Sequence, residues 1–198
     1  MIGPYDGCVL VDVGSGDGRF VYRSALREPE KFFIGIDANA RPLARLSEKI
    51  YRRPEKGGAP NVLFLQAAVE QIPEELRGIA NEVVVQFPWG SLLRGVAAGD
   101  ELVLGNLRKL CRLEARLEVI IGIDTERDRS QIARLGLPEL TDEYLKRELV
   151  PAYESRGFEI EEYGRGSATS WPEIDSSWAR KLRQRSTRVL IFLRGRAI

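Results

Sequence analysis

The 198-residue chain contains no histidine, and this absence excludes several kinds of active site. A Ser-His-Asp triad, a Cys-His pair, an imidazole general base and a histidine-ligated zinc site all require the missing side chain. The two cysteines, Cys8 and Cys111, are too few for a disulfide framework or a thiolate metal site, and their apolar surroundings predict two small core residues. We therefore expect no metal, and chemistry based on carboxylates, hydroxyls, aromatic rings, backbone amides or an organic cofactor.

Long apolar segments are also missing. The longest apolar runs, VLVDV and LEVIIGI, are far shorter than the ~20 residues that cross a bilayer, and no signal segment opens the chain. The content of 43% hydrophobic and 30% charged residues is typical of a folded soluble protein. We therefore expect one cytoplasmic domain over residues 1–198, with its own core and no membrane contact.

The net charge of +1 conceals an uneven distribution. Residues 138–175 carry ten acidic and four basic side chains. Residues 176–198 have no acidic residue and seven basic ones: Arg180, Lys181, Arg183, Arg185, Arg188, Arg194 and Arg196. A second basic cluster comprises Lys49, Arg52, Arg53 and Lys56. Either cluster alone is typical of a solvated surface, but together they favour a partner with a phosphate backbone.

Apolar runs alternate with amphipathic stretches along the chain. This pattern predicts strands at 8–13, 32–37, 62–67, 82–87, 117–123, 158–164 and 187–195, and helices at about 17–27, 40–50, 99–111 and 141–156. Strands that are separated by helices form parallel sheets covered on both faces. We therefore predict a Rossmann-like, doubly wound α/β fold with seven strands, mostly parallel, in which the last two strands form an antiparallel pair at the edge.

A glycine turn follows the first predicted strand. Gly14, Ser15 and Gly16 come directly after the strand that contains Asp12, where open α/β sheets bind ligands. The nicotinamide fingerprint needs glycine at the position of Arg19, whereas Asp12 suits a nucleotide cofactor with a cationic tail. This pattern resembles the first motif of class I S-adenosylmethionine-dependent methyltransferases. Asp37, at the end of the second strand, is expected to bind the ribose hydroxyls.

Two tryptophans are placed in predicted loops. Trp89 lies in a Pro-Trp-Gly turn after the fourth strand, and Trp178 opens the basic C-terminal run. Two loop tryptophans near one cofactor cleft suggest a stacking clamp for a flat ring, as in enzymes that flip a base. Trp171 has no second cue and is interpreted as a loop aromatic or as local packing.

The motifs DVGSGDGR, FFIGIDAN, RRPEKGGAPN, FPWGSLLRG and SSWARKL together resemble the 16S rRNA (adenine-1408)-N1 methyltransferases, which confer kanamycin and apramycin resistance. The resemblance implies methyl transfer from S-adenosylmethionine, with S-adenosylhomocysteine as product. The acceptor would be N1 of adenine 1408 in the helix 44 region of 16S rRNA. The implied partner is the 30S ribosomal subunit, bound by a cytoplasmic monomer that flips the target base.

The resemblance also implies roles for individual residues. The predicted cofactor-binding residues are Asp12, Gly14, Ser15, Gly16, Asp37, Ala67, Ala68, Glu70, Gln86 and Ser91. Trp89 and Trp178 would stack on the flipped adenine, with the Ser176 hydroxyl close by. The predicted RNA-binding residues are Lys49, Arg52, Arg53, Lys56, Arg180, Lys181, Arg183, Arg185 and Arg188. One rRNA-contacting arginine of the family corresponds to Leu135 here, with Arg134 adjacent.

The expected reaction agrees with the absence of histidine. N1 of neutral adenine has a free lone pair and no proton to lose, so catalysis is mostly positioning and needs no general base. Three other readings stay open: a methyltransferase for another RNA site, one for a small molecule, or a non-catalytic rRNA-binding protein. Arg19 and the missing proton-transfer histidine disfavour a nicotinamide dehydrogenase.

Overall fold

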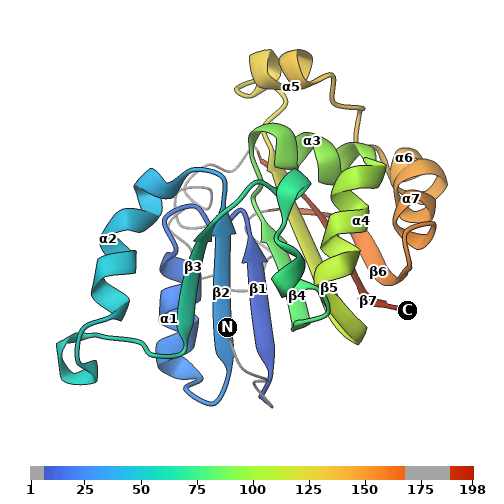
Figure 1. The fold of residues 1–198 in the computed structure, drawn as a ribbon. Helices are drawn as coiled ribbons and strands as arrows, with labels where there is room; N and C mark the ends of the chain where they lie inside the picture. Colours follow the sequence, from blue (N-terminus) through green and yellow to red (C-terminus); the bar gives the residue numbers. More distant parts are fainter. Residues whose placement is uncertain (1–6, 168–187) are drawn as a thin grey trace.

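The computed structural model describes residues 7–167 and 188–198, in which seven strands form one sheet in the order β3-β2-β1-β4-β5-β7-β6 (Figure 1). The strands are β1 (Val9–Val13), β2 (Phe32–Asp37), β3 (Val62–Gln66), β4 (Ala80–Gln86), β5 (Cys111–Ile123), β6 (Phe158–Ser167) and β7 (Val189–Ala197). The first five run parallel, and β7 is antiparallel to both β5 and β6. The predicted α/β fold is confirmed, and its antiparallel pair consists of the edge strand β6 and its neighbour β7.

Helices cover both faces of the sheet, each over its own apolar core. The longer helices are α1 (Arg19–Arg27), α2 (Ala40–Ile50), α3 (Gly90–Ala98) and α4 (Glu101–Leu110). The shorter ones are α5 (Arg129–Leu135), α6 (Asp142–Tyr144), a π-helical turn η4 (Leu145–Leu149), α7 (Val150–Glu154), and the 3-10 turns η1 (Pro54–Lys56), η2 (Val69–Gln71) and η3 (Glu74–Leu76). Side chains of α1 and α2 contribute to one core, and those of α3, α4 and α7 contribute to the other. Figure 1 shows the arrangement of these helices around the sheet. Within the described ranges, no helix has the length and apolarity needed to span a bilayer.

The predicted helix at 99–111 corresponds to α4, the one at 141–156 is divided into α6, η4 and α7, and two further helices were not predicted. The prediction for 99–111 begins at the boundary between α3 and α4: Gly99, with φ +69°, ends α3, and the Asp100 carboxylate caps α4 by accepting the Leu102 and Val103 N–H groups. Helix α3 and the short α5 were not predicted. Strand β5 also begins at Cys111, earlier than the predicted 117. Cys111 is buried as expected, whereas Cys8 is only half-buried.

The sheet topology places one edge of the molecule where a ligand can bind. Strand β1 pairs with β2 on one side and with β4 on the other, so the chain reverses its direction of winding between β1 and β4. At such a switch point, the loops that follow the strands diverge and leave a crevice at the carboxyl ends of the strands. The glycine turn after β1 and the Pro-Trp-Gly turn after β4 both lie at this crevice.

Candidate active site

A cleft of about 580 Å³ lies at the carboxyl ends of the central strands. All ten predicted cofactor-binding residues line it: Asp12, Gly14, Ser15, Gly16, Asp37, Ala67, Ala68, Glu70, Gln86 and Ser91. Trp89 and Arg188 line the same cleft. Residues from four strand ends are therefore brought together as predicted, while their roles in binding stay predictions. Phe20, Asn39 and Pro42, which the sequence patterns did not single out, also line the cleft.

The glycine turn packs closely against β2 and leaves its backbone open to the cleft. The N–H groups of Gly14 and Ser15 both donate to the Ile36 carbonyl, at 2.8 and 3.0 Å. Gly14 has φ +82°, and a Cβ atom there would lie 2.6 Å from Leu92 Cδ2. Because only glycine combines this backbone conformation with so little space, the turn can hold a ligand against its main chain.

The carboxylate of Asp37 is fixed by two backbone groups. Its Oδ2 accepts the Gly16 N–H at 2.8 Å, and its Oδ1 accepts the Asn39 N–H at 2.8 Å. A carboxylate has about four acceptor positions, so both oxygens can still accept a ligand hydroxyl. This geometry is suited to the two hydroxyls of a ribose, which is the role predicted for Asp37.

Asp12 is a buried carboxyl whose side chain faces the cleft with one oxygen unpaired. The residue is 3% exposed, and Oδ1 has no hydrogen-bond partner. Burial, with a smaller contribution from the negative charge of Asp37, raises the pKa of Asp12 to about 8. An unpaired buried carboxyl is unfavourable, and a cationic ligand group would relieve this cost.

Unpartnered buried polar atoms gather at this cleft. Within residues 7–167 and 188–198, six buried side-chain nitrogen or oxygen atoms lack a hydrogen-bond partner. Four of them belong to residues that line the cleft: Asp12 Oδ1, Ser15 Oγ, Gln86 Oε1 and Arg188 Nε. Because buried polar groups are normally paired, this concentration indicates that a polar ligand completes the site. A cofactor with a cationic group and hydroxyls fits these atoms.

The turn after β4 exposes Trp89 at the cleft. Phe87 has φ +51°, an uncommon backbone conformation for a residue other than glycine, and its N–H donates to the Ile120 carbonyl at 2.7 Å. Two residues later, Trp89 precedes α3 and is 50% exposed. A large aromatic side chain that is half-exposed at a cleft is available for stacking on a flat ring.

Several predicted residues lie outside the described part of the chain. These are Ser176 and Trp178 of the predicted catalytic group, the basic residues Arg180, Lys181, Arg183 and Arg185, and Trp171. The roles predicted for them stay predictions.

The structure corrects the prediction for Arg188, which does not lie on an exposed basic surface. It is 7% exposed, and its Nη1 donates to Asp128 Oδ2 at 2.7 Å and to the Gly122 carbonyl at 3.0 Å. The Asp128 side chain is only 11% exposed, and the guanidinium therefore ties the start of β7 to the segment that follows β5. A charge count cannot detect this contact, because the two residues are 60 positions apart.

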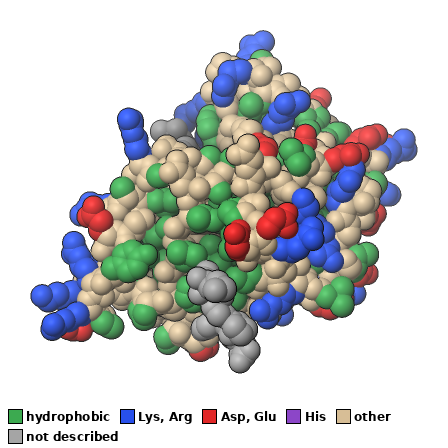
Figure 2. Space-filling view, in the orientation of Figure 1, with side chains coloured by type: hydrophobic (Ala, Val, Ile, Leu, Met, Phe, Trp, Pro, Cys, Tyr) green, Lys and Arg blue, Asp and Glu red, His purple; other side chains and the backbone are tan. Residues whose placement is uncertain are grey.

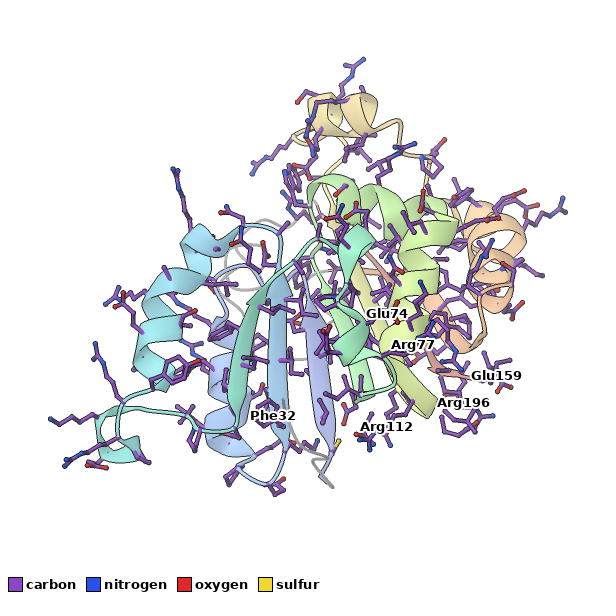
Figure 3. The ribbon with its side chains drawn as sticks, viewed as in Figure 1. Phe32, Glu74, Arg77, Arg112, Glu159 and Arg196 are labelled. Atoms are coloured by element: carbon purple, nitrogen blue, oxygen red, sulfur yellow. The ribbon has the colours of Figure 1, made fainter. Side chains whose placement is uncertain are left out.

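The last two arginines of the basic C-terminal run are also paired. Strand β7 lies between β5 and β6, so Arg194 contacts Glu118 at 2.8 Å and Glu162 at 2.9 Å. Arg196 contacts Glu159 at 2.7 Å, a pair labelled in Figure 3. Cross-strand pairing therefore accounts for these charges. The feature of the sequence that could have predicted this pairing is the acidic segment FEIEEYG, which lies in β6 and pairs with β7.

The other basic cluster is more accessible. Arg52, Arg53 and Lys56 are exposed at the end of α2 and in η1. Lys49 is half-buried, since its ammonium group lies 4.5 Å from the centroid of the Tyr22 ring. The structure thus leaves three of these four side chains directed to solvent, as RNA binding requires.

These features define the class of the protein: a Rossmann-like α/β fold with a nucleotide-cofactor cleft at the switch point of the sheet. A family model described as 16S rRNA (adenine(1408)-N(1))-methyltransferase, NpmA, matches residues 4–197. The chain is 36% identical over 183 residues to the Escherichia coli 16S rRNA (adenine(1408)-N(1))-methyltransferase, and the match covers 92% of this chain and 83% of the relative.

Solved structures agree with the family model. The crystal structure of the aminoglycoside resistance methyltransferase NpmB1 matches with a TM-score of 0.84 and 42% identity, covering 98% of this chain and 90% of that one. A variant of the 16S rRNA (adenine(1408)-N(1))-methyltransferase from Catenulisporales acidiphilia, solved with its cosubstrate SAM, matches with a TM-score of 0.85 and 35% identity, covering 96% and 86%. This chain belongs to the 16S rRNA (adenine(1408)-N(1))-methyltransferase family, whose members are SAM-dependent enzymes.

Proposed function

We propose that this protein transfers the methyl group of S-adenosylmethionine to N1 of adenine 1408 of 16S rRNA and thereby confers aminoglycoside resistance. The observation that carries the proposal is that all ten predicted cofactor-binding residues line one cleft, beside a half-exposed tryptophan, in a chain of this family. The 30S subunit, bound near helix 44 by a monomer of this protein, is the proposed form of the substrate complex.

The residues of the cleft match the parts of the cofactor. Asp12 would pair with a cationic group, Asp37 would accept hydrogen bonds from the ribose hydroxyls, and Ala67 and Ala68 leave room for the adenine ring. S-adenosylmethionine supplies an electrophilic methyl group on a sulfonium. The cleft would hold this group beside the turn that carries Trp89, because Trp89 lines the same cleft.

The acceptor needs an orientation rather than a base. The Trp89 ring would stack on the target adenine, and Trp178 is proposed as the second stacking residue. Stacking of this kind contributes about 1–3 kcal/mol per base, which helps to hold a base outside its helix. Methylation makes the ring cationic, and the face of an aromatic ring stabilises such a charge.

Transfer of a labelled methyl group to purified 30S subunits tests this function. We expect the wild-type protein to label the subunits and the Trp89→Ala variant to lose almost all labelling while still binding S-adenosylmethionine in calorimetry. Labelling of free metabolites in place of 30S subunits would favour the small-molecule alternative. Binding of 30S subunits without binding of the cofactor would favour the non-catalytic alternative.

A further inference from the structure

One side of α2 carries a row of basic side chains, in which the arginines are exposed and Lys49 is half-buried. Arg41, Arg45 and Lys49 follow one another at four-residue intervals, so they lie along one side of the helix, and Arg52 continues the row just beyond its end. The opposite side packs into the core through Leu43 and Ile50. We call Arg41, Arg45, Lys49 and Arg52 the α2 basic stripe.

Arg41 and Arg45 do not stabilise the helix that carries them. Arg41 lies in the first turn, where the positive end of the helix dipole disfavours a cation, and this turn contains no acidic residue. Arg41 and Arg45, and likewise Arg45 and Lys49, are like charges at positions i and i+4, which repel each other. Local helix energetics therefore provide no reason for Arg41 and Arg45, and a bound anion would offset both costs. Lys49 differs, because it lies in the last turn, where the helix dipole favours a cation.

Several arginines elsewhere on the molecule form ion pairs with carboxylates, in contrast to the arginines of the stripe within the described residues. Arg77 pairs with Glu74 at 3.5 Å and Arg196 with Glu159 at 2.7 Å (Figure 3). Among the described residues, no carboxylate forms an ion pair with Arg41, Arg45 or Arg52. In Figure 2, blue side chains project along the left edge with a few red ones among them, and red and blue side chains lie close together on the right.

Two acidic residues accompany the stripe, and both are exposed. Glu48 lies on the same side of α2, three residues after Arg45, and Glu55 lies in η1. Neither forms an ion pair with a described residue. The stripe therefore keeps a net positive charge.

The position of α2 connects the cleft with the basic linker. The helix begins beside the cleft, which Asn39 and Pro42 line, and runs to the linker that contains Arg53 and Lys56 (Figure 1). At 1.5 Å per residue, Arg41 and Lys49 are about 12 Å apart along the helix axis, and Arg52 lies beyond the end of the helix; a few nucleotide phosphates would occupy this span.

We propose that Arg41 and Arg45 bind backbone phosphates of the RNA between the target adenine in the cleft and the linker cluster. The inference rests on the proposed function, because it takes its ligand from the RNA substrate. In this arrangement the α2 basic stripe guides the strand along the helix. The bound phosphates relieve the repulsion among the arginines. Arg41 binds the phosphate that lies nearest to the cleft.

Binding of purified 30S subunits over a series of salt concentrations tests this role. For the Arg41→Glu/Arg45→Glu variant we expect at least a tenfold loss of affinity at low salt. The slope of log affinity against log salt should fall by about 1.4–1.8, since each lost phosphate contact removes about 0.7–0.9. The Arg77→Glu variant changes the net charge at an exposed, already paired arginine and should behave like the wild type. Glu48→Lys extends the stripe and should tighten binding and steepen the slope.

The outcomes separate this inference from the proposed function. If the wild type methylates 30S subunits and the double variant binds them with unchanged affinity and slope, the stripe does not contact RNA and the inference is overturned. A double variant that no longer binds S-adenosylmethionine would show that the arginines maintain the cleft, which also overturns it. Glu48→Lys removes no native contact, so unchanged binding by that variant contradicts the inference even if the double variant fails to fold. If the wild type itself neither binds nor methylates the subunits, the proposed function fails.

Discussion

Cofactor binding should release a proton from Asp12. Because the pKa of this buried carboxyl is raised to about 8, Asp12 is protonated in the free protein at pH 6.5. A cationic cofactor favours the carboxylate, so we expect about one proton to be released per cofactor bound at this pH. Each pH unit below 8 should weaken binding about tenfold, which is about 1.4 kcal/mol per unit.

Calorimetry in two buffers with different ionisation enthalpies measures the released proton directly. A measurement at pH 6.5 is chosen because the α-amino group of the cofactor, with an ordinary pKa of about 7.7–8.0, stays protonated there. The matched control is Asp12→Asn, which keeps the shape of the side chain and should release no proton. If the wild type also releases none at pH 6.5, Asp12 is ionised in the free protein and our account of the site is refuted.

The same carboxyl links stability to pH in the protein without cofactor. The pKa of Asp12 is higher in the folded state than its ordinary value of 3.8, so its contribution to stability is complete below about pH 4 and is lost as the pH rises through about 8. Between these limits its share of the unfolding free energy falls by up to about 1.4 kcal/mol per pH unit. Urea unfolding should therefore show Asp12→Asn gaining stability over the wild type as the pH rises; a constant difference would contradict this linkage.

The remaining predictions concern the ion pairs, the glycine turn and the basic linker. Asp128→Asn leaves the buried Arg188 guanidinium without its charge partner and should lower the unfolding free energy in urea by about 3–5 kcal/mol. Glu74→Gln, which breaks the exposed pair with Arg77, should cost less than about 1 kcal/mol, and equal effects would argue against a buried pair. Gly14→Ala should abolish cofactor binding in calorimetry, since its Cβ would lie 2.6 Å from Leu92 Cδ2 at φ +82°; wild-type affinity would contradict the close packing of the turn. Arg52→Glu/Arg53→Glu should flatten the salt dependence of 30S binding, and an unchanged slope would remove both residues from the RNA contact.

The first half of the fold could be predicted because its signals are local. Strands β1 to β4 are short apolar runs, and the glycine turn with Asp12 and Asp37 directly follows strand ends. In a parallel sheet, residues at the carboxyl ends of neighbouring strands meet at one edge, so the cleft could be inferred before any contact was known.

The features that were missed have weak or distant signals. Helix α3 contains two glycines and begins without a side-chain cap, so its sequence gives a weak helix signal. Its end at Gly99 directly precedes Asp100, the N-cap of α4, so only the second of these two adjacent helices was predicted. The partners of the basic C-terminal residues are set by strand order: β7 lies between two strands that carry carboxylates, and Arg188 meets Asp128 across 60 residues. Composition shows how many charges a segment carries, whereas only the topology shows which of them are paired.

Primer extension on 16S rRNA is the most direct test of the central claim. The template should come from cells that express the wild-type protein and, in parallel, the Trp89→Ala variant. We predict a stop next to adenine 1408 with the wild type, together with resistance to kanamycin and apramycin, and neither effect with the variant. A wild-type protein that binds S-adenosylmethionine but leaves adenine 1408 unmodified would contradict the proposed function.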